Sequence, residues 1–439
     1  MEGGSVDGVE EEYFDRELLD KLKKWIDRKE IIAVKGPRQS GKTTLLKMAM
    51  EWIINDKGID EEYVVFKTME DPEFKDEFEG EPRETVESYL IDDEKHYFFL
   101  DEFNYVEEGG KKLKYLYDVL ENVKFIVTGS SSLELTGKTS KYLVGRMFSS
   151  HLYPFSFWEF LNVRDKRLAR LYSKKNKELW GFLREGSSLD VGGDVFVSEF
   201  SAPFEEYLRY GAYPEVIKTD DEEMKKTVLK NLFDTYIARD IIALLQIQES
   251  SKMREIVKLL SSQLGGIVNY NNLSDSCGLY FKKIKDFLRI LEETYVIDMV
   301  KPYHKNLKTE LRKNPKTYFV DLGLRNYSLG NFLPLESRTD VGEMVENFVL
   351  TQFRHQEAEE IHYWRTQGKA EVDFIYKNGQ DIVPVEVKYK SFDKPKISRG
   401  YRSYISTYEP ERALVATKDF WGEEIIGGTE VRFVPVCYF

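Results

Sequence analysis

The chain has 439 residues, of which 41% are hydrophobic, 14% aromatic and 32% charged, and its formal net charge is −13. This length exceeds what one hydrophobic core supports, so we expect about two to four domains. The two cysteines, Cys277 and Cys437, exclude a disulfide framework and a zinc-ligand pattern. Without a signal-peptide core or a membrane-length apolar run, the chain is expected to be cytoplasmic, with no membrane contact.

The negative charge is concentrated in the first part of the chain. Residues 1–250 hold 36 Lys and Arg against 51 Asp and Glu, whereas residues 251–439 hold 28 against 26. Within the later part, residues 251–320 hold 13 basic and 7 acidic side chains. Because an acidic surface repels polyanions, any contact with nucleic acid is expected from the later part.

The first motif in chain order is a phosphate-binding loop. Residues 31–46 read IIAVKGPRQSGKTTLL, an apolar strand followed by a glycine-rich turn and the start of a helix. Such a turn points backbone N–H groups at phosphates, and the helix N-terminus favours the same anion. Lys42 is expected to reach the β- and γ-phosphates of ATP, and the Thr43 hydroxyl to bind Mg²⁺. The predicted nucleotide-binding residues of the motif are Gly36, Pro37, Arg38, Gln39, Ser40, Gly41, Lys42, Thr43 and Thr44.

The next apolar strand, YFFLDE at residues 97–102, ends in two acids. Behind a phosphate-binding loop, Asp101 is placed to join the Mg²⁺ shell and Glu102 to polarise the attacking water. The alternative is a buried strand with two solvated acids at its end.

A further strand, KFIVTGSSS at residues 124–132, ends in small polar residues. Ligands of parallel sheets bind at the carboxyl ends of the strands, so Thr128 or Ser130 is expected to sense the γ-phosphate or position the water. The alternative is an ordinary loop rich in Ser and Gly.

Arg146 follows in the segment KYLVGRMFSSHLYPFSFWEFL at residues 141–161. It would stabilise the transition-state charge, either within the chain or from a neighbouring subunit of a homo-oligomer. A surface salt bridge is the competing interpretation. The apolar residues 154–160 favour a hydrophobic docking element over chemistry.

Residues 222–300 have helical patterns, and Gly278 separates two predicted helices within them. Apolar residues recur at helical spacing at Phe281, Ile284, Phe287, Leu288 and Leu291. This leaves on the solvated side Lys282, Lys283, Lys285 and Arg289. Strands are expected after the helices, at TYVIDMV and TYFVD, so the pattern predicts a winged helix that contacts the DNA backbone. A protein–protein adaptor is the alternative.

The last part of the chain predicts a nuclease-like core. Glu346 lies on the amphipathic helix VGEMVENFVL, Asp373 on the strand of EVDFIY, and Glu386 and Lys388 on one face of the strand PVEVKYK. Helix Glu, strand Asp and Glu-x-Lys form the PD-(D/E)XK arrangement, in which the carboxylates bind Mg²⁺ or Mn²⁺ and the lysine acts as a catalytic residue. Buried acids of this kind require a metal or ion pairing. Both an active and a vestigial metal site fit the sequence, and an exposed hairpin with solvated charges is the structural alternative.

Several of these segments, GPRQSGKTTLL, YFFLDE, VTGSSS and LVGRMFSSHLYPFSFWEF, together resemble a family of prokaryotic AAA+-like ATPases that is common in archaea. The family carries a C-terminal domain of poorly defined function. The resemblance continues at residues 207–217, 233–241, 315–326 and 371–390, and so covers most of the chain. It also implies that the middle of the chain is a winged helix. The charged segment 161–200 departs from the family pattern by its length and receives no chemical role.

We therefore predict an α/β protein with a P-loop AAA+-like parallel sheet, a helical and winged-helix middle, and a C-terminal α/β PD-(D/E)XK nuclease-like domain. The expected domains are the ATPase at 1–160, a helical lid or linker at 161–245, the winged-helix-like domain at 246–315 and the nuclease-like domain at 316–439. The predicted function is ATP hydrolysis coupled to DNA binding or processing. The alternative is a nucleotide-dependent switch that recruits protein partners and has an inactive nuclease-like domain.

Overall fold

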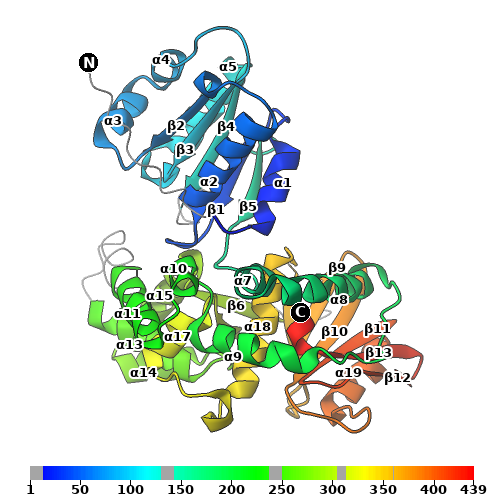
Figure 1. Cartoon of the computed structure of the whole chain (residues 1–439). Helices are drawn as coiled ribbons and strands as arrows, with labels where there is room; N and C mark the ends of the chain where they lie inside the picture. The colour runs from blue at the N-terminus through cyan, green and yellow to red at the C-terminus, as the bar shows by residue number, and fades with distance from the viewer. Residues whose placement is uncertain (1–12, 130–142, 237–249, 304–312, 359) are drawn as a thin grey trace. The chain divides into compact units, whose positions relative to one another are not determined.

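The computed structural model describes residues 13–129, 143–236, 250–303, 313–358 and 360–439 (Figure 1). The chain divides into two compact units. The first comprises Met1–Gly36 and Gly41–Leu152, and the second comprises Pro37–Ser40 and Tyr153–Phe439.

The described part of the first unit is built on a five-stranded sheet in which all pairs of neighbours are parallel. Its strands are β1 Ile31–Lys35, β2 Val64–Thr68, β3 His96–Asp101, β4 Val123–Gly129 and β5 Met147–His151, in the spatial order β2-β3-β4-β1-β5. The residues of β1, β3 and β4 are all buried, as is typical of parallel strands covered on both faces. The parallel sheet predicted for this region is confirmed.

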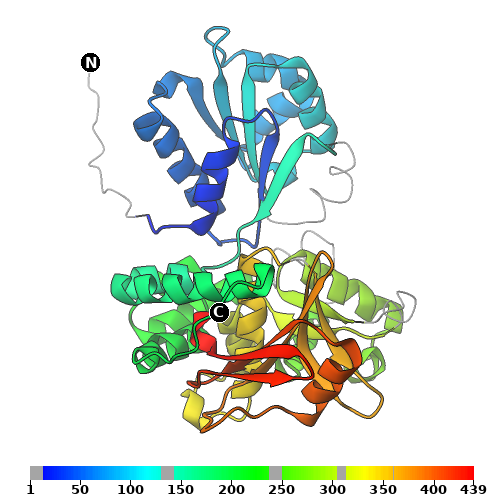
Figure 2. The same ribbon diagram turned by 90° about the vertical axis from the view of Figure 1, so that its right-hand side faces the viewer.

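Helices cover both faces of this sheet (Figure 2). On one face lie α1 Glu17–Trp25 and α2 Lys42–Glu51, and on the other lie α3 Pro72–Gly80, α4 Pro82–Glu87 and α5 Gly109–Val119. Because side chains alternate along a strand, Ile32 packs with α1 and α2, whereas Ile31 faces the other layer. Short turns of other helix types lie at Trp52–Asp56, Glu61–Tyr63 and Phe103–Tyr105.

The described part of the second unit is built on an eight-stranded mixed sheet. Its strands are β6 Ile297–Pro302, β7 Lys316–Phe319, β8 Ile361–Arg365, β9 Glu371–Asn378, β10 Asp381–Lys388, β11 Arg412–Thr417, β12 Gly422–Ile426 and β13 Thr429–Pro435, in the order β12-β13-β11-β10-β9-β8-β6-β7. The antiparallel hairpin β9–β10 turns at Gly379, whose φ of 62° suits glycine. β10, β11 and β13 run parallel to one another.

Two helices pack on opposite faces of this sheet. Phe374 of β9 contacts Phe353 of α18 Val341–His355, whereas the next residue, Ile375, packs with Tyr401 of α19 Arg399–Tyr408. The other described helices are α7 Phe157–Arg164, α8 Lys166–Glu185, α9 Ser201–Tyr210, α10 Pro214–Lys218, α11 Glu222–Phe233, α13 Ser250–Ser262, α14 Tyr270–Cys277, α15 Phe281–Glu293 and α17 Leu322–Leu329, with 3₁₀ turns at Val197–Phe200, Leu335–Ser337 and Val436–Tyr438.

The apolar segment predicted as a docking element belongs to the core of the second unit. The Phe157 ring is fully buried and lies 5.4 Å from the ring of Tyr207 and 5.5 Å from that of Phe348. The segment therefore packs within its own chain.

The predicted boundary at residue 315 cuts through a structural element. α14 and α15 are followed by the antiparallel pair β6–β7, which is the order expected of a winged helix. However, Lys301 of β6 pairs with His362 of β8, so this hairpin extends the C-terminal sheet. The regions predicted as separate domains after residue 160 therefore lie in one compact unit.

Candidate functional site

The turn between β1 and α2 has the backbone shape that a phosphate loop requires. Gln39 and Gly41 have positive φ values of 60° and 94°, so the chain curls tightly before the helix begins. The Gly36 N–H donates to the Gly129 carbonyl oxygen at 3.3 Å, which ties the turn to the end of β4. Lys42 is 4% exposed, and its Nζ donates to the Gly36 carbonyl oxygen at 3.3 Å. Its ammonium group is thus held against the loop.

A chain of hydrogen bonds joins the other residues predicted to bind nucleotide and Mg²⁺. Thr43 Oγ1 donates to Asp101 Oδ2 at 2.6 Å, and Thr128 Oγ1 donates to Asp101 Oδ1. The Glu102 N–H donates to Thr128 Oγ1 at 2.9 Å. Glu102 has a φ of 50°, a strained value for a residue with a side chain and one that is common at functional sites. Its Oε1 lies 3.6 Å from Lys42 Nζ.

The parallel strand register explains why these residues meet. Lys35 of β1 is level with Gly129 of β4, and Leu100 of β3 is level with Val127, so all three strands end at the same edge of the sheet. This is the edge at which parallel sheets bind ligands. Of the two predicted hydroxyls, Thr128 lies in this cluster, and Ser130 lies outside the described residues.

Arg146 lies at the opposite edge of the same sheet. It immediately precedes β5, whose first residue, Met147, is level with Ile31 at the start of β1. The length of β1, about 13 Å, therefore separates Arg146 from the phosphate loop. Its Nε donates to Asp118 Oδ1 at 3.0 Å. The structure thus places Arg146 away from the phosphate loop of its own chain and shows the alternative salt bridge, and a role at the nucleotide stays a prediction.

Lys316 occupies the centre of the C-terminal cluster of charges. Its side chain is 3% exposed, and its Nζ lies 3.0 Å from Glu346 Oε1 and 2.6 Å from Glu371 Oε1. Tyr318, two residues along β7, donates its hydroxyl to Glu346. Burial works against the charged form of Lys316, but the surrounding carboxylates, with Glu346 first among them, outweigh it and raise the pKa. No sequence pattern singled out Lys316, because β7 was predicted only as a wing strand.

Lys388 bridges the two other predicted metal ligands. Its Nζ lies 3.1 Å from Glu386 Oε1 and 3.7 Å from Asp373 Oδ2. Asp373 Oδ2 also accepts the Val387 N–H at 2.8 Å. Burial raises the pKa of Glu386 and raises that of Glu346 to about 6. The predicted residues therefore gather near one another, as an ion-pair network.

This network does not fit a divalent cation as it stands. Among the residues that the structure describes, no three His, Cys, Asp or Glu side chains are grouped so that they could hold a metal ion. In addition, two ammonium groups, of Lys316 and Lys388, contact the carboxylates of Glu346 and Glu386. A buried carboxylate gives up such a partner only at a large cost in free energy. The predicted second cation site is not seen.

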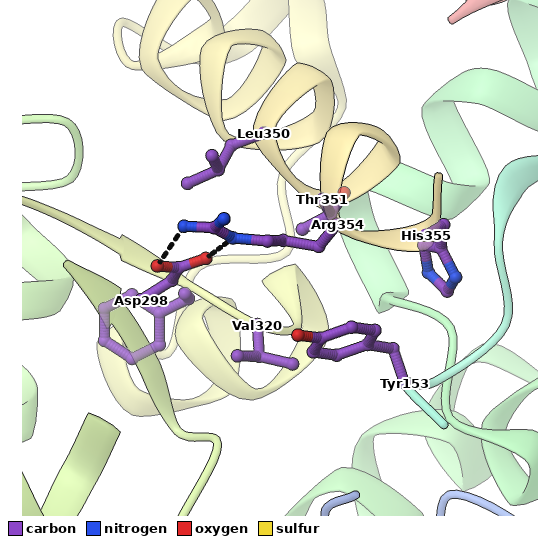
Figure 3. A pocket seen from close by; sticks show the side chains of 8 residues that line it. Tyr153, Asp298, Val320, Leu350, Thr351, Arg354 and His355 are labelled. Atoms are coloured by element: carbon purple, nitrogen blue, oxygen red, sulfur yellow. Dashed lines mark hydrogen bonds and ion pairs between the residues drawn. The ribbon is translucent and has the colours of Figure 1, made fainter. Parts of the chain in front are cut away.

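The cavity in Figure 3 lies between β6 and α18, within the second unit. The Asp298 carboxylate accepts two hydrogen bonds from the Arg354 guanidinium, at 2.5 and 3.0 Å, and the Tyr153 and His355 rings lie 5.6 Å apart. The space of about 10 Å³ is enough for roughly one water molecule. This ion pair therefore fixes the β6–β7 hairpin to α18 and leaves no room for a ligand.

A larger cavity of about 310 Å³ involves the segment 161–200, for which the sequence suggested no chemistry. Asp194 and Ser198 of this segment line it, together with Tyr389 and Lys418. The latter two follow β10 and β11, so the cavity lies at the carboxyl ends of parallel strands. It has the size of a small-molecule site.

The chain matches known families in three separate stretches. Residues 28–161 match the family described as an AAA domain. Residues 201–334 and 341–432 match two families described as domains of unknown function, DUF8612 and DUF4143. The first unit therefore contains a P-loop, and its sequence is similar to AAA domains.

Relatives align over nearly the whole chain. An uncharacterized protein of Haemophilus influenzae is 24% identical over 95% of this chain and 96% of its own length. An uncharacterized protein of Methanocaldococcus jannaschii is 24% identical over 85% of this chain and 78% of its own length. Because such relatives occur in bacteria as well as in an archaeon, the archaeal source expected from the resemblance is not established.

Among solved structures, the Orc1 protein of Aeropyrum pernix in complex with DNA is 11% identical, with a TM-score of 0.34, over 74% of this chain and 94% of that protein. A similarity this low carries no argument about this chain. Every described helix is too short or too polar to cross a membrane.

Proposed function

We propose that the chain couples Mg²⁺-dependent ATP hydrolysis in the first unit to DNA binding by the second. The observation that carries the ATPase part is the hydrogen-bond chain from Thr43 through Asp101 to Thr128. The Asp101 carboxylate accepts hydrogen bonds from two neutral hydroxyls, which do not offset a carboxylate charge as an ammonium group would. Thr43 and Asp101 are therefore the residues that would hold Mg²⁺.

Bound MgATP supplies the phosphoanhydride bond and the metal charge that offsets the phosphate oxygens. The backbone N–H groups of residues 36–43 would bind the phosphates, with Lys42 Nζ directed at the β- and γ-phosphates. Glu102 Oε1 would accept a hydrogen bond from the attacking water and orient it, because Thr128 fixes the Glu102 backbone. The contact of 3.6 Å between Lys42 Nζ and Glu102 Oε1 keeps both groups within reach of one phosphoryl group.

The DNA-binding part is supported by the order α14, α15, β6 and β7, which is that of a winged helix, and by basic side chains on α15. Lys282, Lys285 and Arg289 are exposed on this helix. The C-terminal network would bind DNA without cutting it, because its carboxylates are neutralised by Lys316 and Lys388. We therefore propose a DNA-binding ATPase whose nuclease-like centre is inactive.

The ATPase part is tested by phosphate release. Lys42→Ala is expected to lower ATP turnover about 100-fold or more, because it removes the cation at the phosphates. Glu102→Gln is expected to lower turnover to a similar degree while ATP still binds, since only the water-orienting carboxylate is lost. Lys47→Ala, an exposed lysine of the same helix, serves as the control. Unchanged turnover in Lys42→Ala would overturn the assignment.

The DNA part is tested by fluorescence anisotropy of labelled DNA with MgATP at several salt concentrations. Affinity is expected to fall steeply as salt rises, because phosphate contacts release counterions. Failure to bind duplex, branched and single-stranded DNA at low salt would refute this part and leave the nucleotide-dependent protein switch as the function.

A further inference from the structure

The start of α15 exposes two adjacent aromatic side chains. Tyr280, which precedes the helix, is 88% exposed, and Phe281, its first residue, is 45% exposed. The helical pattern predicts that Phe281 is buried, so its exposure is a finding of the structure. Exposing a large aromatic ring to water costs free energy, which makes such a pair a candidate contact surface.

A cation lies beside the Phe281 ring and that of Tyr270, the first residue of α14. Lys285 Nζ lies 4.7 Å from the centre of the Phe281 ring and 5.4 Å from that of Tyr270, and the two rings are 5.5 Å apart. Residues 280–290 contain four basic side chains and one acidic side chain. The acid, Asp286, lies 3.9 Å from Arg289. Phe281 and Lys285 are one helical turn apart and share a face, so aromatic and positive groups form one surface.

We propose that this surface, formed by Tyr270, Tyr280, Phe281, Lys282 and Lys285, stacks unpaired bases of DNA. It rests on the proposed DNA binding and specifies the substrate class, namely single-stranded or branched DNA. A base offers its flat face to an aromatic ring only where it is not stacked inside a duplex. The lysines beside the rings neutralise the phosphates of the same nucleotides.

The charge pattern argues for nucleic acid as the occupant of this surface. A protein partner would cover the two rings with apolar side chains, and the neighbouring ammonium groups of Lys282 and Lys285 would then lose their hydration. A polyanion with aromatic bases satisfies both the rings and the lysines. The same combination of stacking rings and basic side chains is typical of proteins that bind single strands.

The test uses the full-length chain and three labelled probes: an oligothymidylate, a blunt duplex of equal length, and that duplex with a single-stranded tail. The full-length chain is expected to prefer the single strand and the tailed duplex. Tyr280→Ala and Phe281→Ala are each expected to weaken binding of the single strand about tenfold and binding of the blunt duplex by less than twofold. Tyr280→Phe should retain the affinity, since the ring remains.

Salt dependence separates stacking from charge. Tyr280→Ala should leave the slope of log affinity against log salt unchanged, whereas Lys285→Ala should reduce it by about 0.7. Tyr115→Ala removes a ring that is 45% exposed on α5 of the first unit, and it serves as the matched control.

The outcomes are distinguishable. If no probe binds, the proposed DNA binding fails, and this inference fails with it. If DNA binds but Tyr280→Ala and Phe281→Ala leave the affinity for single strands unchanged, or weaken duplex binding equally, the stacking surface is refuted while DNA binding stands. In that case the aromatic pair would be assigned to a protein partner.

Discussion

Asp101 in the first unit and Glu386 in the second are both buried carboxylates near the ends of sheet strands, but they have partners of different charge. Asp101 accepts hydrogen bonds from the hydroxyls of Thr43 and Thr128. Glu386 lies 3.1 Å from the ammonium group of Lys388. Hydroxyls satisfy a carboxylate without cancelling its charge, whereas an ammonium group cancels it.

The difference distinguishes a site whose carboxylate is still available to a metal ion from a site whose carboxylates are already paired with lysine ammonium groups. In the first unit, a metal that met Asp101 would replace neutral donors at little cost. In the second, a metal would have to displace Lys316 or Lys388, each of which is held by two carboxylates. Acidic residues in a nuclease-like pattern therefore do not by themselves make a metal site; the positions of the lysines decide.

Removing the buried Lys316 should have the largest effect on stability and on metal binding, and it would test this comparison most directly. Lys316→Met leaves Glu346 without its cation and leaves Glu371 with only Arg365, so we expect about 3 kcal/mol of destabilisation. We also expect the variant to gain a Mn²⁺ site, visible by electron paramagnetic resonance without nucleotide, and Mn²⁺ to restore part of the lost stability. The wild-type second unit should show neither effect.

Two further variants control this experiment. Lys377→Met removes a partly exposed lysine of β9 and should change neither stability by more than about 0.5 kcal/mol nor Mn²⁺ binding. Adding Asp373→Asn to Lys316→Met should abolish the gained site. Mn²⁺ binding near Asp373 in the wild-type chain would show that the lysines do not block a metal, and the contrast between the two centres would be lost.

Glu292 of α15 is a partly exposed carboxylate whose pKa is strongly raised. Burial, and then the charge of Asp298, raise the pKa of Glu292 from 4.5 to about 7. A raised carboxyl pKa contributes stability that is fully present below pH 4.5 and is lost as the pH rises through about 7. Glu292→Gln should therefore stabilise the protein at pH 8.5, by on the order of 2 kcal/mol, relative to its effect at pH 5.

Calorimetric unfolding at pH 5 and pH 8.5 measures this effect, with the exposed Glu223→Gln as the control. An identical change in stability at both pH values would mean that Glu292 does not titrate between them. Glu292 would then make no pH-dependent contribution to the free energy of unfolding in this range.

Arg146→Ala should have the smallest effect. Its ion pair with Asp118 is at the surface, so we expect a loss of less than about 1 kcal/mol in stability and less than about twofold in ATP turnover. A fall in turnover of about 1,000-fold would instead indicate that Arg146 acts on the nucleotide of a neighbouring subunit. Adding chains with Lys42→Ala but intact Arg146 would then restore part of the activity.

The local sequence was sufficient to predict the phosphate-binding site of the first unit, because the chemistry of that site depends on a short motif. The loop from Gly36 to Thr43 has one backbone path between a strand and a helix, and Asp101 and Glu102 directly follow a buried strand. Parallel strands end at one edge, so these residues had to meet. Thr128 followed by the same reasoning.

The position of Arg146 in the sheet could not be predicted in this way. Its sequence position was compatible with either edge of the sheet, and only the parallel pairing of β5 with β1 placed it away from the phosphate loop. Phe281 is a similar case, because helical spacing does not indicate where the face that packs against the core ends.

What the sequence by itself determined is the nucleotide-binding loop with its partner acids, the parallel sheet of the first unit, and the identity of the acids and the lysine that gather on β9, β10 and α18. What only the tertiary structure decided is how these last acids are neutralised. Lys316 lies on β7, in a stretch predicted as a wing, and it reaches Glu346 because β6–β7 extends the C-terminal sheet. Whether two charges compensate each other depends on the distance between residues that are far apart in the chain, and a local sequence pattern does not predict that distance.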